Sequence, residues 1–304
     1  MVKALGIEGY DFNNIPDVQM EWLWQDYLAK GSMTVLAAAP KVGKSTLLFH
    51  LLQKMRLHET FLDRPTNLNG DKILLFTEES AYLLKQRKEE LGDLPVHCVG
   101  LQPGLSWIKM VAYIKYMARQ EHKLVIIDTI SRFWPVQNEG DAVQVLQALT
   151  PLLTVARTED VALLLIHHTR KTGGSEGNAM RGSNALLGSA DIGIELGRIT
   201  PWDKTNRRRL EALSRYSTPD TLTMEKVGTE YVVSAEGNIE KQVMEYVSFE
   251  GSITAEGFAE ETGKSLRTAQ KILSELSARG VLDRTGSGGP RSPFIFTIAS
   301  TRKD

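Results

Sequence analysis

Residues 38–46, with the sequence AAPKVGKST, constrain the fold of this chain more than any other stretch. Residues 33–37 before them are apolar and partly β-branched, which predicts a buried strand. Residues 44–57 after them gather their leucines on one side of a helix. A strand, a short loop and a helix in this order form a phosphate-binding loop, because backbone N–H groups of the loop and of the helix N-terminus converge on one anion. We therefore expect a nucleotide phosphate site here.

Individual residues of this loop suggest how a triphosphate would be held. Lys44 adds a positive charge at the β- and γ-phosphates, and the Ser45 hydroxyl is placed to ligate Mg²⁺. The general pattern has glycine at its first position, where this chain has Ala38, and a methyl group is tolerated there if the backbone φ stays negative. The residues expected to bind ATP are Ala39, Pro40, Lys41, Val42, Gly43, Lys44, Ser45 and Thr46.

Two further apolar segments end in acids that fit the same site. Residues 72–77 (KILLFT) are followed by Glu78 and Glu79, and residues 123–129 (KLVIIDT) carry Asp128 near their end. Open α/β sheets bind ligands at the carboxyl ends of their strands, so a carboxylate there can orient Mg²⁺ and its waters. One acid at the end of a strand is a weak signal, and its pairing with an upstream phosphate loop is a strong one. The alternative is that Glu78 is a solvated carboxylate at the end of a strand, and Glu79 is expected to be an ordinary residue and not a catalytic one.

The composition is typical of a globular protein and limits the partners it can have. The 304 residues include 42% hydrophobic and 24% charged residues, with a net charge of −1. The length predicts more than one domain, and the charge balance requires any contact with nucleic acid to come from local basic patches. Cys98 is the single cysteine, which excludes a disulfide within the chain and a Cys-based metal site.

Two negative observations bear on where the protein works. The start of the chain lacks the apolar core of a signal peptide, and the longest apolar run, at residues 161–166, is far too short to span a bilayer. With the single cysteine, these observations predict a cytoplasmic protein that does not enter membranes.

Strand and helix patterns alternate through residues 33–170, which predicts an α/β fold with a mostly parallel sheet and helices on both faces. Residues 172–183 are polar and rich in glycine, so we expect a mobile loop there. Further strands are expected up to residue 234. The predicted large domain covers residues 1–235, and its first 32 residues form a lead-in segment that packs on the core of the domain or on a neighbouring subunit.

The pattern changes at residue 236 to three short helices followed by a hairpin, which predicts a winged helix-turn-helix domain over residues 236–304. The third helix, residues 265–279, turns polar residues away from its apolar stripe, where a recognition helix meets DNA. The residues of this domain expected to contact DNA are Arg267, Lys271, Arg284 and Arg291. The alternative is that this domain binds a protein.

These motifs together resemble the RecA-like ATPases of the plasmid and phage RepA helicase type. The resemblance covers residues 16–234 and includes the segments APKVGKST, LLFTEES, VIIDT, LLLIHHTRK and MRGSNALLGSADIGIEL. Members of that family form hexameric rings, hydrolyse ATP at subunit interfaces and move on single-stranded DNA. The resemblance therefore implies ATP and Mg²⁺ as cofactors, and DNA and further copies of this chain as partners.

The resemblance also assigns catalytic roles. Glu78 corresponds to the base that polarises the attacking water, Asp128 to the acid that orders Mg²⁺, and His168 to the sensor of the γ-phosphate. The alternative for His168 is a structural role, as a hydrogen-bonded histidine. The family has an arginine finger where this chain has Asp191, so the resemblance leaves two candidates for the catalytic cation, Arg181 and Arg215.

The loop after residue 168 is expected to contact single-stranded DNA through Arg170, Lys171 and Arg181, unless it is a solvated loop that binds nothing. The leading hypothesis is thus a ring-forming DNA helicase. The alternatives are an ATP-switched DNA-binding regulator or loader, and a recombinase-like filament built from the same core.

Overall fold

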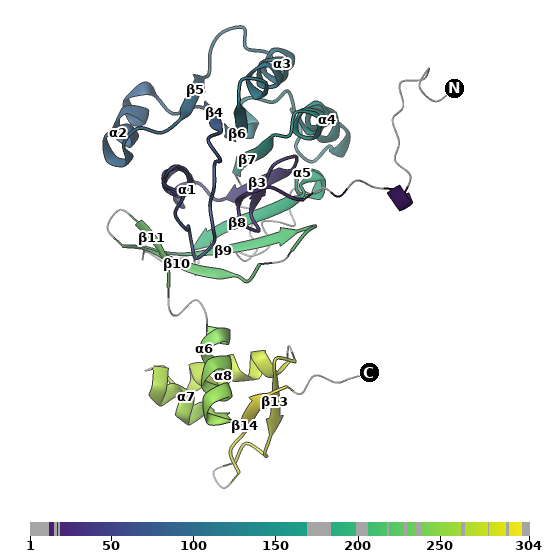
Figure 1. Ribbon diagram of the computed structural model, residues 1–304. Helices are drawn as coiled ribbons and strands as arrows, with labels where there is room; N and C mark the ends of the chain where they lie inside the picture. The colour runs from purple at the N-terminus through teal and green to yellow at the C-terminus, as the bar shows by residue number, and fades with distance from the viewer. Residues whose placement is uncertain are drawn as a thin grey trace. The chain divides into compact units, whose positions relative to one another are not determined.

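The computed structural model describes residues 12–14, 17, 19–168, 184–198, 206–217, 219–227, 230–234, 239–262, 265–278, 280–289 and 292–299 (Figure 1). The chain divides into two units, Met1–Val233 and Ser234–Asp304.

A large sheet forms the centre of the first unit. Within the described residues it has nine strands in the order β11-β10-β9-β8-β3-β7-β6-β4-β5. The strands from β8 to β5 run parallel, and β8 to β11 form an antiparallel meander at the other side. The strands are β3 (Met33–Ala38), β4 (Lys72–Thr77), β5 (Val96–Gly100), β6 (His122–Asp128), β7 (Ala162–His168), β8 (Ile192–Arg198), β9 (Arg207–Ser214), β10 (Leu222–Val227) and β11 (Glu230–Val233).

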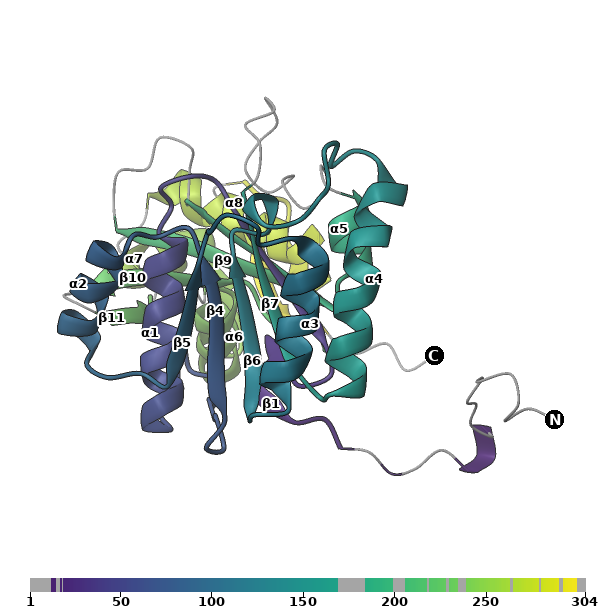
Figure 2. The same ribbon diagram turned by 90° about the horizontal axis from the view of Figure 1, so that it is seen from above.

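Helices cover both faces of this sheet (Figures 1 and 2). The helices are α1 (Lys44–Leu57), α2 (Ala81–Leu91), α3 (Trp107–Ala118), α4 (Ala142–Thr158) and α5 (Asn184–Ser189). Alternate residues of β3 show the two layers, because Leu36 packs in the core with α1, whereas Val35 packs in the core with α3 and α4. The expected α/β fold with a mostly parallel sheet between two helical layers is confirmed.

Polar side chains fix the starts of the surface helices. The Ser80 hydroxyl accepts the Leu83 N–H at the start of α2, and Asp141 accepts the N–H groups of Val143 and Gln144 at 2.9 and 3.3 Å at the start of α4. These caps satisfy N–H groups that have no partner within the helix, and they fix the residues at which α2 and α4 begin.

A short hairpin precedes β3 and packs on its own domain. Its strands are β1 (Trp22–Trp24) and β2 (Leu28–Ala29), and the side chains of Trp24 and Tyr27 are buried in the core that contains α1. The Trp24 indole N–H donates to the Phe61 carbonyl at 3.1 Å. Of the two interpretations of the lead-in segment, the structure thus places these aromatic residues in the core of the domain itself.

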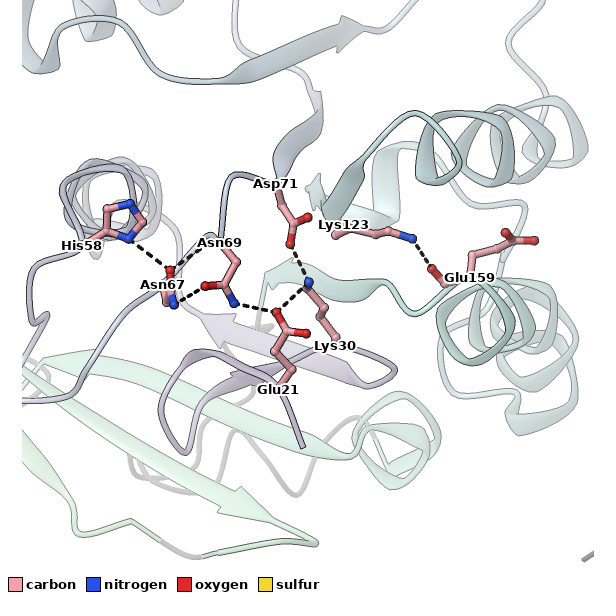
Figure 3. Close-up of polar contacts among 8 residues, drawn as sticks. All are labelled: Glu21, Lys30, His58, Asn67, Asn69, Asp71, Lys123 and Glu159. Carbon is pink, nitrogen blue, oxygen red and sulfur yellow. Dashed lines mark hydrogen bonds and ion pairs between the residues drawn. The ribbon is translucent and has the colours of Figure 1, made fainter. Parts of the chain in front are cut away.

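A buried lysine fastens the hairpin to the chain ahead of β4 (Figure 3). Lys30 Nζ lies 2.7 Å from a carboxylate oxygen of both Glu21 and Asp71, and its side chain is 9% exposed. Asn69 donates to Glu21 at 2.7 Å, so three chain segments meet at one ammonium group. Figure 3 also shows the Lys123 ammonium donating to the Glu159 backbone carbonyl, which ties β6 to the end of α4.

The second unit is a small helical domain with a three-stranded antiparallel sheet in the order β12-β14-β13. Its elements are α6 (Ile239–Glu250), β12 (Ile253–Thr254), α7 (Ala255–Thr262), α8 (Leu266–Ala278), β13 (Leu282–Thr285) and β14 (Ile295–Ile298). Phe258, Leu273 and Phe296 lie at the centre of its core. The apolar spacing of α8 predicts an inward Leu266, but this side chain is 42% exposed, because it opens the helix one turn before the first buried position, Ala269.

Short 3-10 turns complete the described chain at η2 (Phe12–Asn14) and η3 (Ile130–Arg132). In the described residues, every helix falls short of the length and apolar character that crossing a membrane requires.

Candidate active site

The phosphate-binding loop follows β3 at the carboxyl edge of the sheet. Ala38 is the last residue of β3 and is absent from the residues with positive φ, so the backbone there has the geometry that tolerates a methyl group. Gly43 has a φ of 111° and directly precedes α1, where no side chain caps the helix. The N–H groups of the first helical turn have no acceptor within a helix. The positive end of the helix dipole also lies there, so this position favours an anion.

Lys44, the first residue of α1, is held over this loop by two neighbours. Its ammonium lies 2.9 Å from His168 Nδ1 and 3.4 Å from the Ala39 carbonyl oxygen. An ammonium can only donate, so Nδ1 accepts and His168 is neutral with its proton on Nε2. Burial lowers the pKa of Lys44, and the nearby carboxylates of Asp128 and Glu78 oppose that shift. Burial and the charge of Lys44 lower the pKa of His168.

Ser45 and Asp128 form a pair of oxygen donors beside the lysine. The Ser45 hydroxyl donates to Asp128 Oδ2 at 3.4 Å, and Asp128 is 6% exposed at the end of β6. Burial, followed by the charge of Glu79, raises the pKa of Asp128 to about 6. A hydroxyl and a carboxylate are the hard ligands that Mg²⁺ prefers, and phosphates and waters usually complete its shell. These two residues therefore fit a nucleotide-bound Mg²⁺, while the described residues contain no cage of three or more metal ligands.

Glu78 lies one residue beyond β4, next to the end of β6. Its backbone N–H donates to the Asp128 carbonyl at 3.2 Å. Its Oε2 lies 2.9 Å from Arg132 Nε, and its Oε1 accepts the Thr129 hydroxyl at 3.5 Å. Its charge opposes the lowering of the pKa of both Lys44 and His168 by burial. A carboxylate at this edge of the sheet can take a proton from water near a γ-phosphate.

Glu79 turns toward α2 instead. Its N–H donates to the Thr77 hydroxyl at 3.0 Å, and its Oε1 lies 3.9 Å from Arg87 Nη2. Its effect on the pKa of Asp128 is larger than that of Glu78. The two neighbouring acids therefore have different partners, Arg132 for Glu78 and Arg87 for Glu79. Glu78 is the one whose charge acts on the pKa of Lys44.

The AAA_25 family, described as an AAA domain, matches residues 8–174, which is more than half of the chain. The chain belongs to the AAA_25 family. This AAA_25 protein is thus a member of a family of P-loop ATPase domains, and the match contains Lys44, Glu78, Asp128 and His168.

Curated relatives share part of this AAA_25 protein. It is 26% identical over 155 residues to the DNA repair protein RadA of Halalkalibacterium halodurans, and 26% identical over 153 residues to that of Streptococcus pneumoniae. Each alignment covers 49% of this chain but only 30% and 33% of the relatives, so the chain spans about a third of their length.

The crystal structure of the RadB recombinase aligns with 67% of this chain and 91% of its own, at a TM-score of 0.47 and 16% identity. That similarity is too low to support an argument about function.

Two residues from the antiparallel meander of the AAA_25 protein hold the phosphate-binding loop from outside the parallel strands. Arg208 Nε on β9 donates to the Val42 carbonyl at 2.7 Å. A methyl group on Gly43 would lie 2.9 Å from the Tyr231 hydroxyl oxygen on β11, so this tyrosine sits directly on the loop. The loop is therefore fixed by contacts with residues far along the chain.

Arg215, one candidate for the catalytic cation, lies near the start of β3, at the opposite end of the strand from the phosphate-binding loop. It pairs with Asp191 at 3.5 Å and donates to the Gly188 carbonyl at 3.2 Å. The other carboxylate oxygen of Asp191 accepts the N–H of Met33, the first residue of β3, whereas the phosphate-binding loop follows the last residue of β3. In its own subunit Arg215 is thus remote from Lys44, and its side chain is 57% exposed.

Several predicted DNA contacts lie on the surface of the second unit. Arg267 and Lys271 are exposed on α8, and Lys271 pairs with Glu275 at 3.7 Å. The guanidinium of Arg284 lies 4.5 Å from the centroid of the Phe294 ring. Four predicted residues lie outside the described residues, namely Arg170, Lys171, Arg181 and Arg291.

The sequence interpretation missed three residues around the site. Arg132 contacts Glu78 directly, and its signal was available, because a cation four residues after a strand-end acid reaches the same sheet edge. Arg208 and Tyr231 reach the loop from β9 and β11. No local pattern marks those two residues, because only the order of strands in the sheet brings them near residue 43.

Proposed function

We propose that this protein is an ATP-dependent motor that acts on DNA, and specifically a ring-forming helicase of the replicative type. The observation that carries the proposal is the convergence of Lys44, Asp128 and Glu78 at one sheet edge, beside a helix N-terminus suited to phosphate. The start of α1, the residue after β4 and the end of β6 supply these groups, so their meeting is a property of the fold that a chance match to a loop pattern would lack. The similarity to proteins named for DNA repair supports DNA as the partner.

The described side chains suggest a mechanism for hydrolysis. Lys44 and the N–H groups of the loop hold the β- and γ-phosphates, and Ser45 and Asp128 supply ligands for Mg²⁺, which neutralises phosphate charge when bound. Glu78 takes a proton from water as the water oxygen bonds to the γ-phosphorus and the bond to ADP breaks. His168 can exchange its bond with Lys44 for one to the γ-phosphate and so report its loss.

The catalytic cation would come from a neighbouring subunit. Arg215 is exposed and remote from the site in its own chain, as a residue acting across an interface must be. Arg181 is the other candidate. A closed ring of identical subunits would place one such arginine at each site, and a hexamer is the assembly that the family resemblance favours.

The second unit would supply contacts with duplex DNA. Its element order supports a winged helix-turn-helix, because α7 ends at Thr262, α8 begins at Leu266, and the antiparallel pair β13 and β14 follows. The exposed Arg267 and Lys271 on α8 occupy the place of a recognition helix, and Arg284 lies on the hairpin.

Strand displacement on a forked duplex tests the proposal. Wild-type protein should separate strands in the presence of ATP and Mg²⁺, and the Lys44→Ala variant should not. Protein that hydrolyses ATP yet separates no strands under conditions where it binds the fork would overturn the helicase assignment and leave a DNA-associated ATPase.

The second candidate is an ATP-switched regulator or loader, which the basic face of α8 favours. Two double variants separate these functions. The test variant is Arg267→Ala/Lys271→Ala, and the control is Lys85→Ala/Lys88→Ala, because Lys85 and Lys88 are similarly exposed but lie on α2. A motor should keep most of its DNA-stimulated ATPase in both double variants. A site-specific regulator should lose duplex affinity only in the first.

A further inference from the structure

Both oxygens of the Glu78 carboxylate are engaged. Oε2 lies 2.9 Å from Arg132 Nε in an ion pair, and Oε1 accepts the Thr129 hydroxyl at 3.5 Å. A general base needs a lone pair directed at the water it deprotonates, and here each carboxylate oxygen already accepts from a protein donor. In this arrangement the Glu78 carboxylate lies at the edge of the sheet where a base is needed, but Arg132 and Thr129 bind its two oxygens.

Arg132, the ion-pair partner of Glu78, lies on a turn whose backbone is anchored. Arg132 closes the 3-10 turn η3, which is anchored by the buried side chains of Ile130 and Trp134 and by the N–H of Arg132 bonding to the Thr129 carbonyl at 3.0 Å. The backbone is thus fixed, and the long side chain of Arg132 can move by its own torsions alone. That side chain is 59% exposed, so an external anion can reach it.

We propose that Arg132 keeps Glu78 from acting as a base, and that a phosphodiester group of a nucleic acid strand releases Glu78 by binding the Arg132 guanidinium in its place. Arg132 is then a positioning residue whose ligand is a nucleic-acid phosphate. This inference rests on the proposed function, since it concerns the base of the same ATPase site.

Two features favour a phosphate as the competing ligand. A guanidinium binds phosphate oxygens in a planar, two-pronged manner that matches or exceeds its fit to a carboxylate. The pair itself is easily exchanged, because 35% of the Glu78 side chain and 59% of the Arg132 side chain are exposed, and such pairs are weak in water. A multivalent strand can therefore displace the carboxylate without disturbing the fold.

Steady-state ATPase assays, with and without single-stranded DNA, test the inference in the full-length protein. The variants are Arg132→Ala, Arg132→Lys and the control Arg119→Ala, whose side chain is 61% exposed and pairs with Glu159. Arg132→Ala should raise the DNA-free kcat about fivefold, the equivalent of about 1 kcal/mol, and should lower the stimulation by DNA by the same factor. Arg132→Lys retains a cation and should restore most of the DNA dependence, and Arg119→Ala should match wild type.

Three outcomes would overturn the inference. If Arg132→Ala lowers kcat both with and without DNA, the arginine assists catalysis directly. If it raises only the KM for ATP and leaves DNA stimulation intact, the arginine binds the nucleotide. Wild-type protein that binds ATP but never hydrolyses it overturns the proposed function as well, so the two failures are distinguishable.

Discussion

The replacement Asp128→Asn should stabilise the protein while abolishing ATP hydrolysis. Asp128 is 6% exposed, and burial together with neighbouring Glu79 raises its pKa from 3.8 to about 6. At neutral pH the folded protein must keep this carboxylate ionised in surroundings that disfavour its charge. Asparagine has the same shape and can still accept the Ser45 hydroxyl, so it removes the charge without leaving a cavity.

The size of the effect follows from the shift in the pKa. A shift of about two units costs about 3 kcal/mol of folding stability at pH 7, at about 1.4 kcal/mol per unit. For a domain of this size, removing that cost should raise the Tm by about 5–10 °C. Because the folded state binds the proton more tightly than the unfolded state, wild-type stability falls as pH rises between about 4 and 6. The advantage of Asp128→Asn should therefore be complete above pH 6 and about half as large near pH 5.

Thermal unfolding followed by circular dichroism, without nucleotide and with EDTA to remove Mg²⁺, measures both quantities. Asp93→Asn serves as a control, because Asp93 is 85% exposed, and its Tm should match wild type. Mg²⁺-ATP should raise the Tm of wild type and have little effect on Asp128→Asn. A variant that melts at or below wild type near neutral pH, or whose advantage does not change with pH, would refute the argument that burial of this charge opposes folding.

Three further predictions concern the loop and a helix start. Gly43→Ala should cost about 1–2 kcal/mol in urea unfolding, because of the φ of 111° and the 2.9 Å approach to the Tyr231 hydroxyl, and Tyr231→Phe should relieve only the second part. Arg208→Ala should weaken ATP binding several-fold in calorimetry without changing the Tm by more than a few degrees, because the Val42 carbonyl loses its 2.7 Å partner; unchanged affinity would refute a role in holding the loop. Asp141→Ala should cost about 1 kcal/mol in thermal unfolding and leave ATP affinity unaltered, because it removes the cap of α4, and a loss of ATP affinity would contradict this assignment.

Most of the first unit could be predicted because its elements carry their patterns locally. The helix expected at residues 44–57 and the strand expected at 72–77 are found with those bounds. The proximity of Glu78 and Asp128 could also be predicted, since parallel strands bring their carboxyl ends to one edge of a sheet. The pairing of Thr77 with Asp128 in neighbouring strands is the direct result.

What the sequence could not supply depends on contacts between distant segments. The hairpin at residues 22–29 has strands of two and three residues, too short for any periodic pattern. Tyr231 approaches residue 43 only because β8 to β11 turn back as an antiparallel meander on one side of β3. The helix α5 was likewise not predicted, because its six residues make fewer than two turns and show no repeated apolar spacing.

The last residue of β3 has a consequence for how such sites are recognised. Ala38 pairs with His168 on one side and Leu196 on the other, so the first position of the motif belongs to the sheet and its backbone stays in the extended region. Glycine is required only at Gly43, where φ is 111°. A search pattern written in letters, with glycine demanded at both ends, passes over this chain. A pattern written in torsion angles retains it, together with any other ATPase in which the sheet extends one residue further into the loop.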